Sequence, residues 1–497
     1  MSAARIQPQA LRAQPERAGR LAPRAGVARS AALSPACERA RRRLVWTVML
    51  AYLLVIFEGA IRKYIAPQFG QYIFFIRDPF VIYAYLLAFR FGLWPRNQAW
   101  CSLSFFLCGF GVVLFFLQLA AFGFDNTRLI LGVYGWRSYF FYLPLAFLIG
   151  AQFRRQDVLR FARVTLLLAA PMGALVAAQF WSPPNAPINV GVAEDEEFQF
   201  KSVTLSLERI RTTGTFTSPG GQSQFIGTAF AFLLGMMLLP KPRPNPLFLA
   251  ISAAGLLTCV ALSGSRGAVL TCGVVLLFAL GLALVGKGGA FRAKAFALPI
   301  ALAAVAVVLY PIVFPEGFET FMGRWTGAAA AESQVGGVGG RAVLGLLDFM
   351  RFIGDVGSLG YGLGYGGNAA IILGAEVDGV KVGYLVEADF SRHMVDLGPV
   401  FGVCYILLRL ALIGWLAKLV LNSTRRSPDP LPMMMFSFAG LALLSGQITG
   451  LGTATAYCWL FVGLCIASAR EALLNSPRRS LSLPKLRLNN INPASTT

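Results

Sequence analysis

Arginines between long apolar stretches are the residues of this chain with the clearest chemical potential. Arg266 lies in the tight turn Ser263–Gly267, which joins two apolar stretches without a spacer. A helical hairpin needs small residues in such a turn, but it does not need an arginine. A guanidinium group pairs bidentately with phosphate oxygens and keeps its charge at a membrane boundary. The turn therefore predicts a phosphate or diphosphate site.

Three further arginines are candidates for the same diphosphate: Arg77, Arg211 and Arg341. Arg211 precedes a run that leads directly into an apolar stretch, which predicts that it lies beside Arg266 at the membrane interface. The alternative for each cation is that it snorkels to lipid headgroups or balances a nearby acid.

A second group of ionisable residues lies just before or within the start of an apolar stretch: Glu387, Asp389, Arg392, His393 and Asp396. A carboxylate that is partly desolvated there can act as a general base. The alternative is an ion pair, such as Asp389 with Arg392, that orders the start of the helix. His393 is the only histidine, which excludes a histidine-based metal site and leaves a structural and a catalytic role equally open.

The composition places these residues in an integral membrane protein. The 497 residues are 56% hydrophobic and 13% charged, and the mean hydropathy is +0.63, which is too apolar for a soluble protein. The net charge of +21 gathers at the chain ends and in short loops, where it sets orientation. Nucleic acid is therefore not expected as a partner.

The apolar stretches predict an all-α polytopic membrane protein with about twelve transmembrane helices. The predicted spans are residues 44–60, 73–91, 99–121, 130–150, 158–180, 222–239, 246–263, 267–286, 295–314, 394–420, 431–448 and 454–469. With both termini in the cytoplasm, every inward loop is basic, as the positive-inside rule requires.

Three regions follow from this topology. Residues 1–43 form a basic, disordered cytoplasmic tail, for which an organellar transit peptide is the alternative. Residues 44–470 form the membrane domain, and residues 471–497 form a basic cytoplasmic tail. Two long loops face outward, residues 181–221 and 315–393, and Arg341–Asp355 of the second has the pattern of an amphipathic helix on the membrane surface.

This combination of motifs and apolar stretches resembles the O-antigen ligase and polysaccharide polymerase family of bacterial envelope glycosyltransferases. The resemblance covers most of residues 44–470. The residues that carry the resemblance are Arg211–Pro219, Ser263–Gly267, the glycine run Gly360–Gly367, and Asp396–Gly398 with Gly402. Ligases of this family have a histidine eleven residues before the glycine of the last motif, where this chain has Glu387. That departure favours a polymerase over a ligase.

The resemblance implies a GT-C-like fold in the bacterial inner membrane and a metal-independent glycosyltransferase without a cofactor. Its donor would be a glycan on polyprenyl diphosphate, held by Arg211 and Arg266 with help from Arg341 or Arg77. Glu387, or else His393, would be the base that activates the acceptor glycan.

Membrane lipid, a chain-length regulator and a flippase of the same exopolysaccharide or O-antigen pathway are the other expected partners. The alternatives are a ligase to the lipid A core, a transporter or flippase of an anionic lipid or small molecule, and a non-catalytic assembly subunit.

Overall fold

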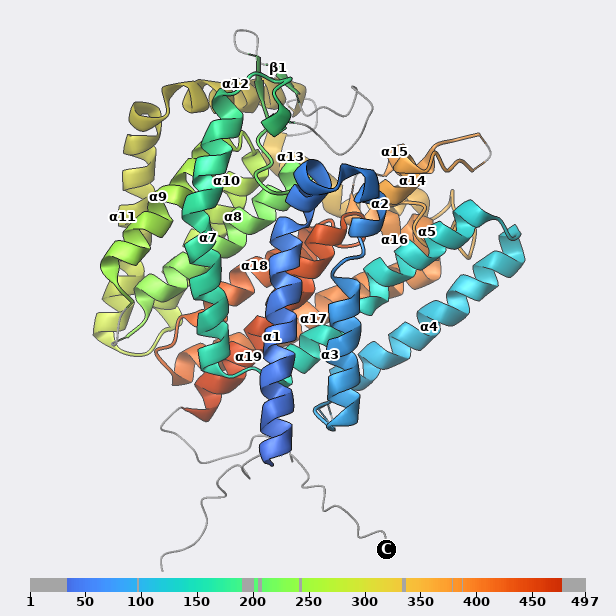
Figure 1. Ribbon diagram of the computed structural model, residues 1–497, viewed down its shortest axis with the longest axis horizontal. Helices are drawn as coiled ribbons and strands as arrows, with labels where there is room; N and C mark the ends of the chain where they lie inside the picture. The colour runs from blue at the N-terminus through green and yellow to red at the C-terminus, as the bar shows by residue number, and fades with distance from the viewer. Residues whose placement is uncertain are drawn as a thin grey trace, which may run out of the picture.

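Helices make up almost all of the computed structural model (Figure 1). It describes residues 34–95, 98–189, 201–203, 208–240, 244–332, 337–377, 379–386 and 388–475. The described strands are β1 (Lys201–Val203) and β2 (Glu208–Ile210), which pair antiparallel in a short hairpin. The structure is therefore all-α apart from this hairpin, as the sequence predicts.

The long helices follow the predicted spans along the chain. They are α1 (Pro35–Ala60), α3 (Asp78–Arg90), α4 (Ala99–Phe122), α5 (Asn126–Trp136), α6 (Leu143–Gln152), α7 (Arg155–Trp181), α8 (Pro219–Leu238), α9 (Pro246–Leu262), α10 (Arg266–Val285), α11 (Gly289–Val313), α17 (Pro399–Arg426), α18 (Leu431–Ser445) and α19 (Gly452–Leu474). α1 begins nine residues before the predicted span, inside the predicted tail, because Ser34 caps it and Pro35 occupies its first turn.

Eight helices in the described part of the chain are long and apolar enough to cross a membrane. α9 and α18 are apolar but shorter. The α5–α6 region is divided by a π-helical turn, η3 (Arg137–Phe141), so neither half spans a bilayer of about 30 Å alone. The helices thus identify a multi-pass membrane protein, while the number of about twelve spans stays a prediction.

The centre of the bundle is α19, because 94% of its most apolar window is buried. Gly463 on α19 allows close approach to α6, since a Cβ there would lie 2.9 Å from the Ala146 carbonyl oxygen. By contrast, only 6% of the corresponding window of α11 is buried, so this helix lies at the periphery. Small residues at helix contacts are typical of packing within membranes.

The irregular segments lie at one end of the bundle, opposite the start of α1 and the end of α19 (Figure 1). They include η1 (Ile61–Ile65), η2 (Pro67–Phe69), α2 (Gly70–Ile73), η4 (Pro187–Asn189), the β hairpin, α12 (Pro315–Glu332), α13 (Gly337–Leu347), η7 (Asp348–Phe352), α14 (Asn368–Ile372), α15 (Val382–Leu385) and α16 (Asp389–Leu397). We call this the irregular end.

The predicted surface helix over Arg341–Asp355 is divided. Residues up to Leu347 belong to α13, and the chain then tightens into the 3₁₀ helix η7. Val343, Leu344 and Met350 are 55%, 51% and 55% exposed, so both pieces present apolar side chains at the surface.

Helices α7 and α9 should be sensitive to any side chain at their closest contact. A Cβ at Gly255 would lie 2.5 Å from the Ala169 carbonyl oxygen, whereas a Cβ at Gly273 on α10 would meet nothing within 4 Å. We expect Gly255→Val to destabilise the protein by about 2 kcal/mol, the usual cost of overpacking, and to lower its melting temperature in detergent. Gly273→Val is the matched control, and equal melting temperatures for the two variants would contradict this packing.

Candidate functional site

Three arginines form a positively charged group at the irregular end, which we call the α10 arginine cluster: Arg211, Arg266 and Arg324. Arg211 follows β2, Arg266 begins α10, and Arg324 lies on α12. The Ser263–Gly267 turn holds them together, because the Arg324 Nη1 donates to the Gly264 carbonyl oxygen at 2.7 Å. Gly264 has a φ of +55°, a conformation that favours glycine.

The segment after Arg211 is fixed against the same turn. The Thr212 hydroxyl donates to the Leu262 carbonyl oxygen at 3.1 Å, and the Ser223 and Ser265 hydroxyls lie 3.0 Å apart. Ser265 also caps α10 by accepting from the Ala268 amide. The structure therefore brings Arg211 and Arg266 together through side chains on both sides of the turn.

The electrostatics of the cluster favour an anion. Burial, and then the charge of Arg266, lower the pKa of Arg211. Burial, and then the charge of Arg211, lower the pKa of Arg324 to about 10. Within the described residues, neither Arg211 nor Arg324 forms an ion pair with a carboxylate. A phosphate group would relieve this repulsion between like charges.

Two of the predicted site residues are not placed by the structure. Glu387 lies outside the described residues. Arg341 belongs to α13, but its side chain is not among those described. Their predicted roles, as base and as diphosphate ligand, stay predictions.

Arg77 belongs to a different group, which we call the Phe74 arginine cage: Arg62, Arg77 and Arg137 around the Phe74 ring. The guanidinium carbon lies 5.8 Å from the ring centroid for Arg62, 5.7 Å for Arg77 and 4.6 Å for Arg137. Arg77 is 0% exposed and forms a 3.0 Å ion pair with Glu58. The contacts of Arg77 are thus with the cage and with Glu58, and its predicted part in binding the diphosphate stays a prediction.

His393 is fully buried in α16, and both of its ring nitrogens are occupied. Nε2 lies 2.8 Å from Nη1 of Arg409, and Nδ1 lies 3.0 Å from the Tyr139 hydroxyl. An arginine can only donate, so Nε2 accepts and the proton of the neutral ring is assigned to Nδ1. Tyr139 then accepts from His393 and donates to Asp396 at 3.1 Å. In this geometry neither ring nitrogen of His393 is free to accept a proton from another group.

Burial controls the protonation of the α16 side chains. It lowers the pKa of His393 to about 3, although the nearby Asp389 opposes the shift. It raises the pKa of Asp396 to about 7, against hydrogen bonds from the Gly366 amide and from Tyr139. The sequence pattern indicated a carboxylate with a raised pKa in this region, and among the described residues Asp396 has that property.

Arg409 joins α16 to the helices that follow it. Its Nη1 forms a 2.5 Å ion pair with Asp389, and its Nε donates to the Leu443 carbonyl oxygen at the end of α18 at 2.8 Å. The Asp389 carboxylate also accepts from the Thr449 amide and hydroxyl at 3.1 and 2.8 Å. We did not predict Arg409, although an arginine within an apolar stretch is a signal for it.

The glycine run Gly360–Gly367 approaches protein backbone rather than a nucleotide. A Cβ at Gly360 would lie 2.5 Å from the Val395 carbonyl oxygen of α16, and a Cβ at Gly364 would lie 2.3 Å from the Leu131 carbonyl oxygen of α5. Both glycines have positive φ angles, +71° and +89°. The run therefore holds α16 against α5.

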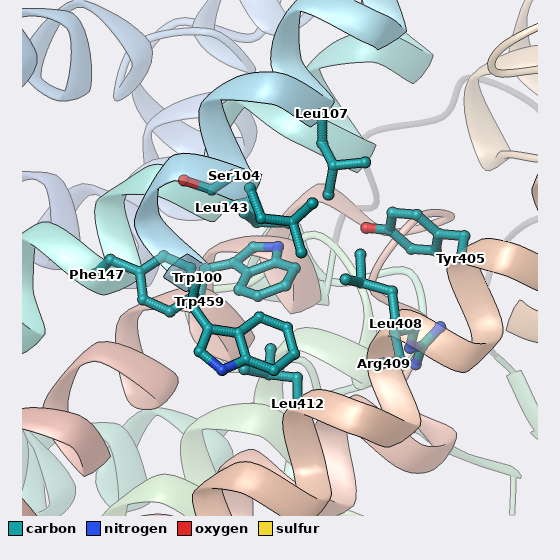
Figure 2. Close-up of a pocket in the computed structure, with 11 residues that line it drawn as sticks. Trp100, Ser104, Leu107, Leu143, Phe147, Tyr405, Leu408, Arg409, Leu412 and Trp459 are labelled. Carbon is teal, nitrogen blue, oxygen red and sulfur yellow. The ribbon is translucent and has the colours of Figure 1, made fainter. Parts of the chain in front are cut away.

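A cavity beside Arg409 is too small and too apolar for a glycan (Figure 2). Its volume is about 10 Å³, room for a single water at most. Apolar side chains such as Trp100, Leu412 and Trp459 line most of it. Among the described residues, no three His, Cys, Asp or Glu side chains are placed to hold a metal ion.

Loss of Arg409 should destabilise the irregular end strongly. Arg409→Met leaves the Asp389 carboxylate, with 2% of its side chain exposed, without its closest cation. We expect a loss of about 3 to 5 kcal/mol in unfolding free energy. Arg155→Met is the matched control, because the Arg155 side chain is 35% exposed in its ion pair with Asp429, and it should cost about 1 kcal/mol or less. Similar melting temperatures for the two variants would contradict the dependence on Arg409.

The raised pKa of Asp396 predicts a dependence of stability on pH. The folded pKa is about 7, above the unfolded value of 3.8, so the folded state binds more protons between these values. The stability that Asp396 contributes is therefore complete below pH 3.8 and is lost as the pH rises through 7. Relative to Asp396→Asn, the wild type should lose at most about 1.4 kcal/mol per pH unit across this window. A constant difference in melting temperature between the two proteins would contradict the shift.

Comparison of the chain with protein-family models, with curated proteins and with solved structures finds no match in any of the three.

Proposed function

We propose that this protein is a multi-pass membrane glycosyltransferase of the polysaccharide polymerase type. It would transfer glycan repeats from polyprenyl diphosphate to an acceptor glycan on the outer face of the bacterial cytoplasmic membrane. The observation that supports this most is the α10 arginine cluster, in which Arg211, Arg266 and Arg324 gather beside a tight turn between two apolar helices.

The cluster suits a diphosphate that enters from the lipid. The polyprenyl chain would lie along apolar helices while the guanidinium groups bind the diphosphate oxygens at the boundary. As the bond between the anomeric carbon and the diphosphate oxygen breaks, negative charge grows on the leaving group. The arginines stabilise that charge.

A hydroxyl group of the acceptor glycan is the nucleophile. Its oxygen forms the new glycosidic bond, its proton goes to a general base, and polyprenyl diphosphate leaves. A single displacement of this kind inverts the anomeric carbon. Glu387 is the proposed base. His393 is proposed as a positioning residue, because both of its nitrogens are engaged in the buried network.

Polymerase and ligase differ in the acceptor, and a transporter or flippase would bind the same lipid without transfer. The departure at Glu387 from the ligase histidine favours the polymerase. A chain-length regulator and a flippase of the same pathway are the proposed partners.

The test is an electrophoretic profile of surface polysaccharide from a gene-deleted strain complemented with variants at matched membrane expression. We expect Arg266→Ala and Glu387→Gln each to abolish long chains while single repeats remain, because one stabilises the leaving group and the other removes the proton. Arg351→Ala is the matched control, because Arg351 lies on η7 with 71% of its side chain exposed.

Other profiles distinguish the alternatives. Long chains that stay on the lipid carrier and are absent from the lipid A core would indicate a ligase. Full-length polymer with a normally inserted Arg266→Ala protein would exclude the proposed diphosphate site. An unchanged profile in the deleted strain itself would favour a transporter.

A further inference from the structure

Three buried arginines each have an N–H group without a hydrogen-bond acceptor in the described part of the chain: Arg77 just before α3, Arg137 on η3 and Arg392 on α16. The groups are Nη2 of Arg77, Nη1 of Arg137 and Nη1 of Arg392. The residues are 0%, 4% and 4% exposed. The nearest carboxylate oxygen to Nη1 of Arg392 belongs to Asp389 at 3.6 Å, an ion pair beyond hydrogen-bond length. Leaving buried charged donors unsatisfied is costly.

These arginines have neighbouring contacts. Arg77 and Arg137 face the Phe74 ring, and this ring lies 5.4 Å from the ring of Tyr134. Adjacent glycines contact Tyr134 and Arg392, because a Cβ at Gly367 would lie 3.5 Å from Cε1 of Tyr134 and a Cβ at Gly366 would lie 3.2 Å from Cγ of Arg392. Tyr134 therefore links Arg392 to the Phe74 arginine cage.

The backbone around the start of α19 contacts two of these arginines. A Cβ at Gly452 would lie 2.9 Å from Nη2 of Arg77, and a Cβ at Gly450 would lie 2.2 Å from Nη1 of Arg392. Two of the unsatisfied N–H groups thus approach glycines that are separated by a single residue. A side chain at either position would occupy the space of an arginine head.

Positive charge is in excess within the cage. Arg77 pairs with Glu58 at 3.0 Å, and Arg137 pairs with Asp78 at 2.5 Å. Arg62 lies 3.6 Å from the same Glu58 carboxylate, which is already engaged with Arg77. Three guanidinium groups therefore face two carboxylates in a largely desolvated place, where an additional anion is favourable.

The cage is distinct from the α10 arginine cluster. The C-terminal end of α1 contacts both groups. Glu58 pairs with Arg77 of the cage, while Gly59 packs against the Phe216 backbone of the segment after Arg211. Lys63 fixes that segment further, since its Nζ donates to the Thr213 hydroxyl at 2.8 Å.

We propose that Arg77, Arg137 and Arg392 form an oxyanion-binding site that takes one phosphate or carboxylate group, separate from the α10 arginine cluster. Arginine forks match both groups, because each presents two oxygens in the geometry of a guanidinium edge. The group can belong to an acidic glycan or to the headgroup of an anionic lipid. The proposal does not rest on the proposed glycosyl transfer.

The test is binding of sodium pyrophosphate and of sodium glucuronate to the purified full-length chain in detergent micelles. The readout is the thermal unfolding midpoint at constant ionic strength, because a ligand that binds only the folded state raises it saturably. The measurement is made in an Arg211→Gln/Arg266→Gln/Arg324→Gln background, which removes all three arginines of the α10 arginine cluster. We expect a saturable rise with at least one of the two probes.

Two variants of the proposed oxyanion site in that background identify it. Arg392→Lys keeps the charge but removes the fork, and Gly450→Ala displaces the Arg392 head without removing it. Each should weaken the bound probe at least about tenfold, the factor that corresponds to 1.4 kcal/mol. The matched control is Arg351→Lys on η7, because the Arg351 side chain is 71% exposed and its Nε pairs with Asp348 at 2.9 Å.

The two probes distinguish the possible sources of the oxyanion. Glucuronate binding would support a carboxylate-bearing glycan, and pyrophosphate binding that phosphatidylglycerol nanodiscs suppress would support a lipid headgroup. No saturable rise with either probe would overturn the proposal, as would a rise that Arg392→Lys and Gly450→Ala leave unchanged. The polysaccharide profile of Arg266→Ala tests the α10 cluster alone, so the failure of one site is distinguishable from the failure of the other.

Discussion

The ion pair between Arg409 and Asp389 is the constraint on which the irregular end depends. A guanidinium on a membrane helix must be neutralised and hydrogen-bonded where it lies. Arg409 meets that requirement with Asp389 and His393 of α16 and with the Leu443 carbonyl oxygen of α18. Thr449 donates to the same Asp389, so the segment between α18 and α19 takes its position from the pair. One charge thus determines where three helices meet.

The placement of α16 extends from this pair to the other parts of the irregular end. The glycine run packs on α16 because Gly360 and Gly364 have no side chains at its contacts with α16 and α5. The Gly366 amide donates to Asp396 at 2.7 Å, and the Gly366 carbonyl oxygen accepts from Arg392 at 2.8 Å. Arg392 is therefore held in front of the Phe74 arginine cage by the same residues that hold α16.

Hydropathy predicted the positions of the long helices, and the small residues of the Ser263–Gly267 turn predicted the hairpin of α9 and α10. Local sequence could not predict that Arg77 lies in the Phe74 arginine cage, because its partner Tyr142 is far along the chain. The hydrogen-bond network of His393 depends on Tyr139, which is 254 residues away in the sequence. No pattern near either residue indicates that the two lie together. The π-helical turn at Arg137 likewise interrupts an apolar stretch that hydropathy alone reads as continuous.

The direction of the hydrogen bonds around His393 has a consequence for proton movement. A relay passes a proton onward only if every member can exchange its donor and acceptor roles. The chain from Arg409 through His393 and Tyr139 to Asp396 begins at a guanidinium, which cannot accept. A proton that arrives at Asp396 therefore cannot be passed through Tyr139 and His393 to Arg409. The buried network therefore fixes the direction of its hydrogen bonds and offers no continuous route for a proton between Asp396 and Arg409.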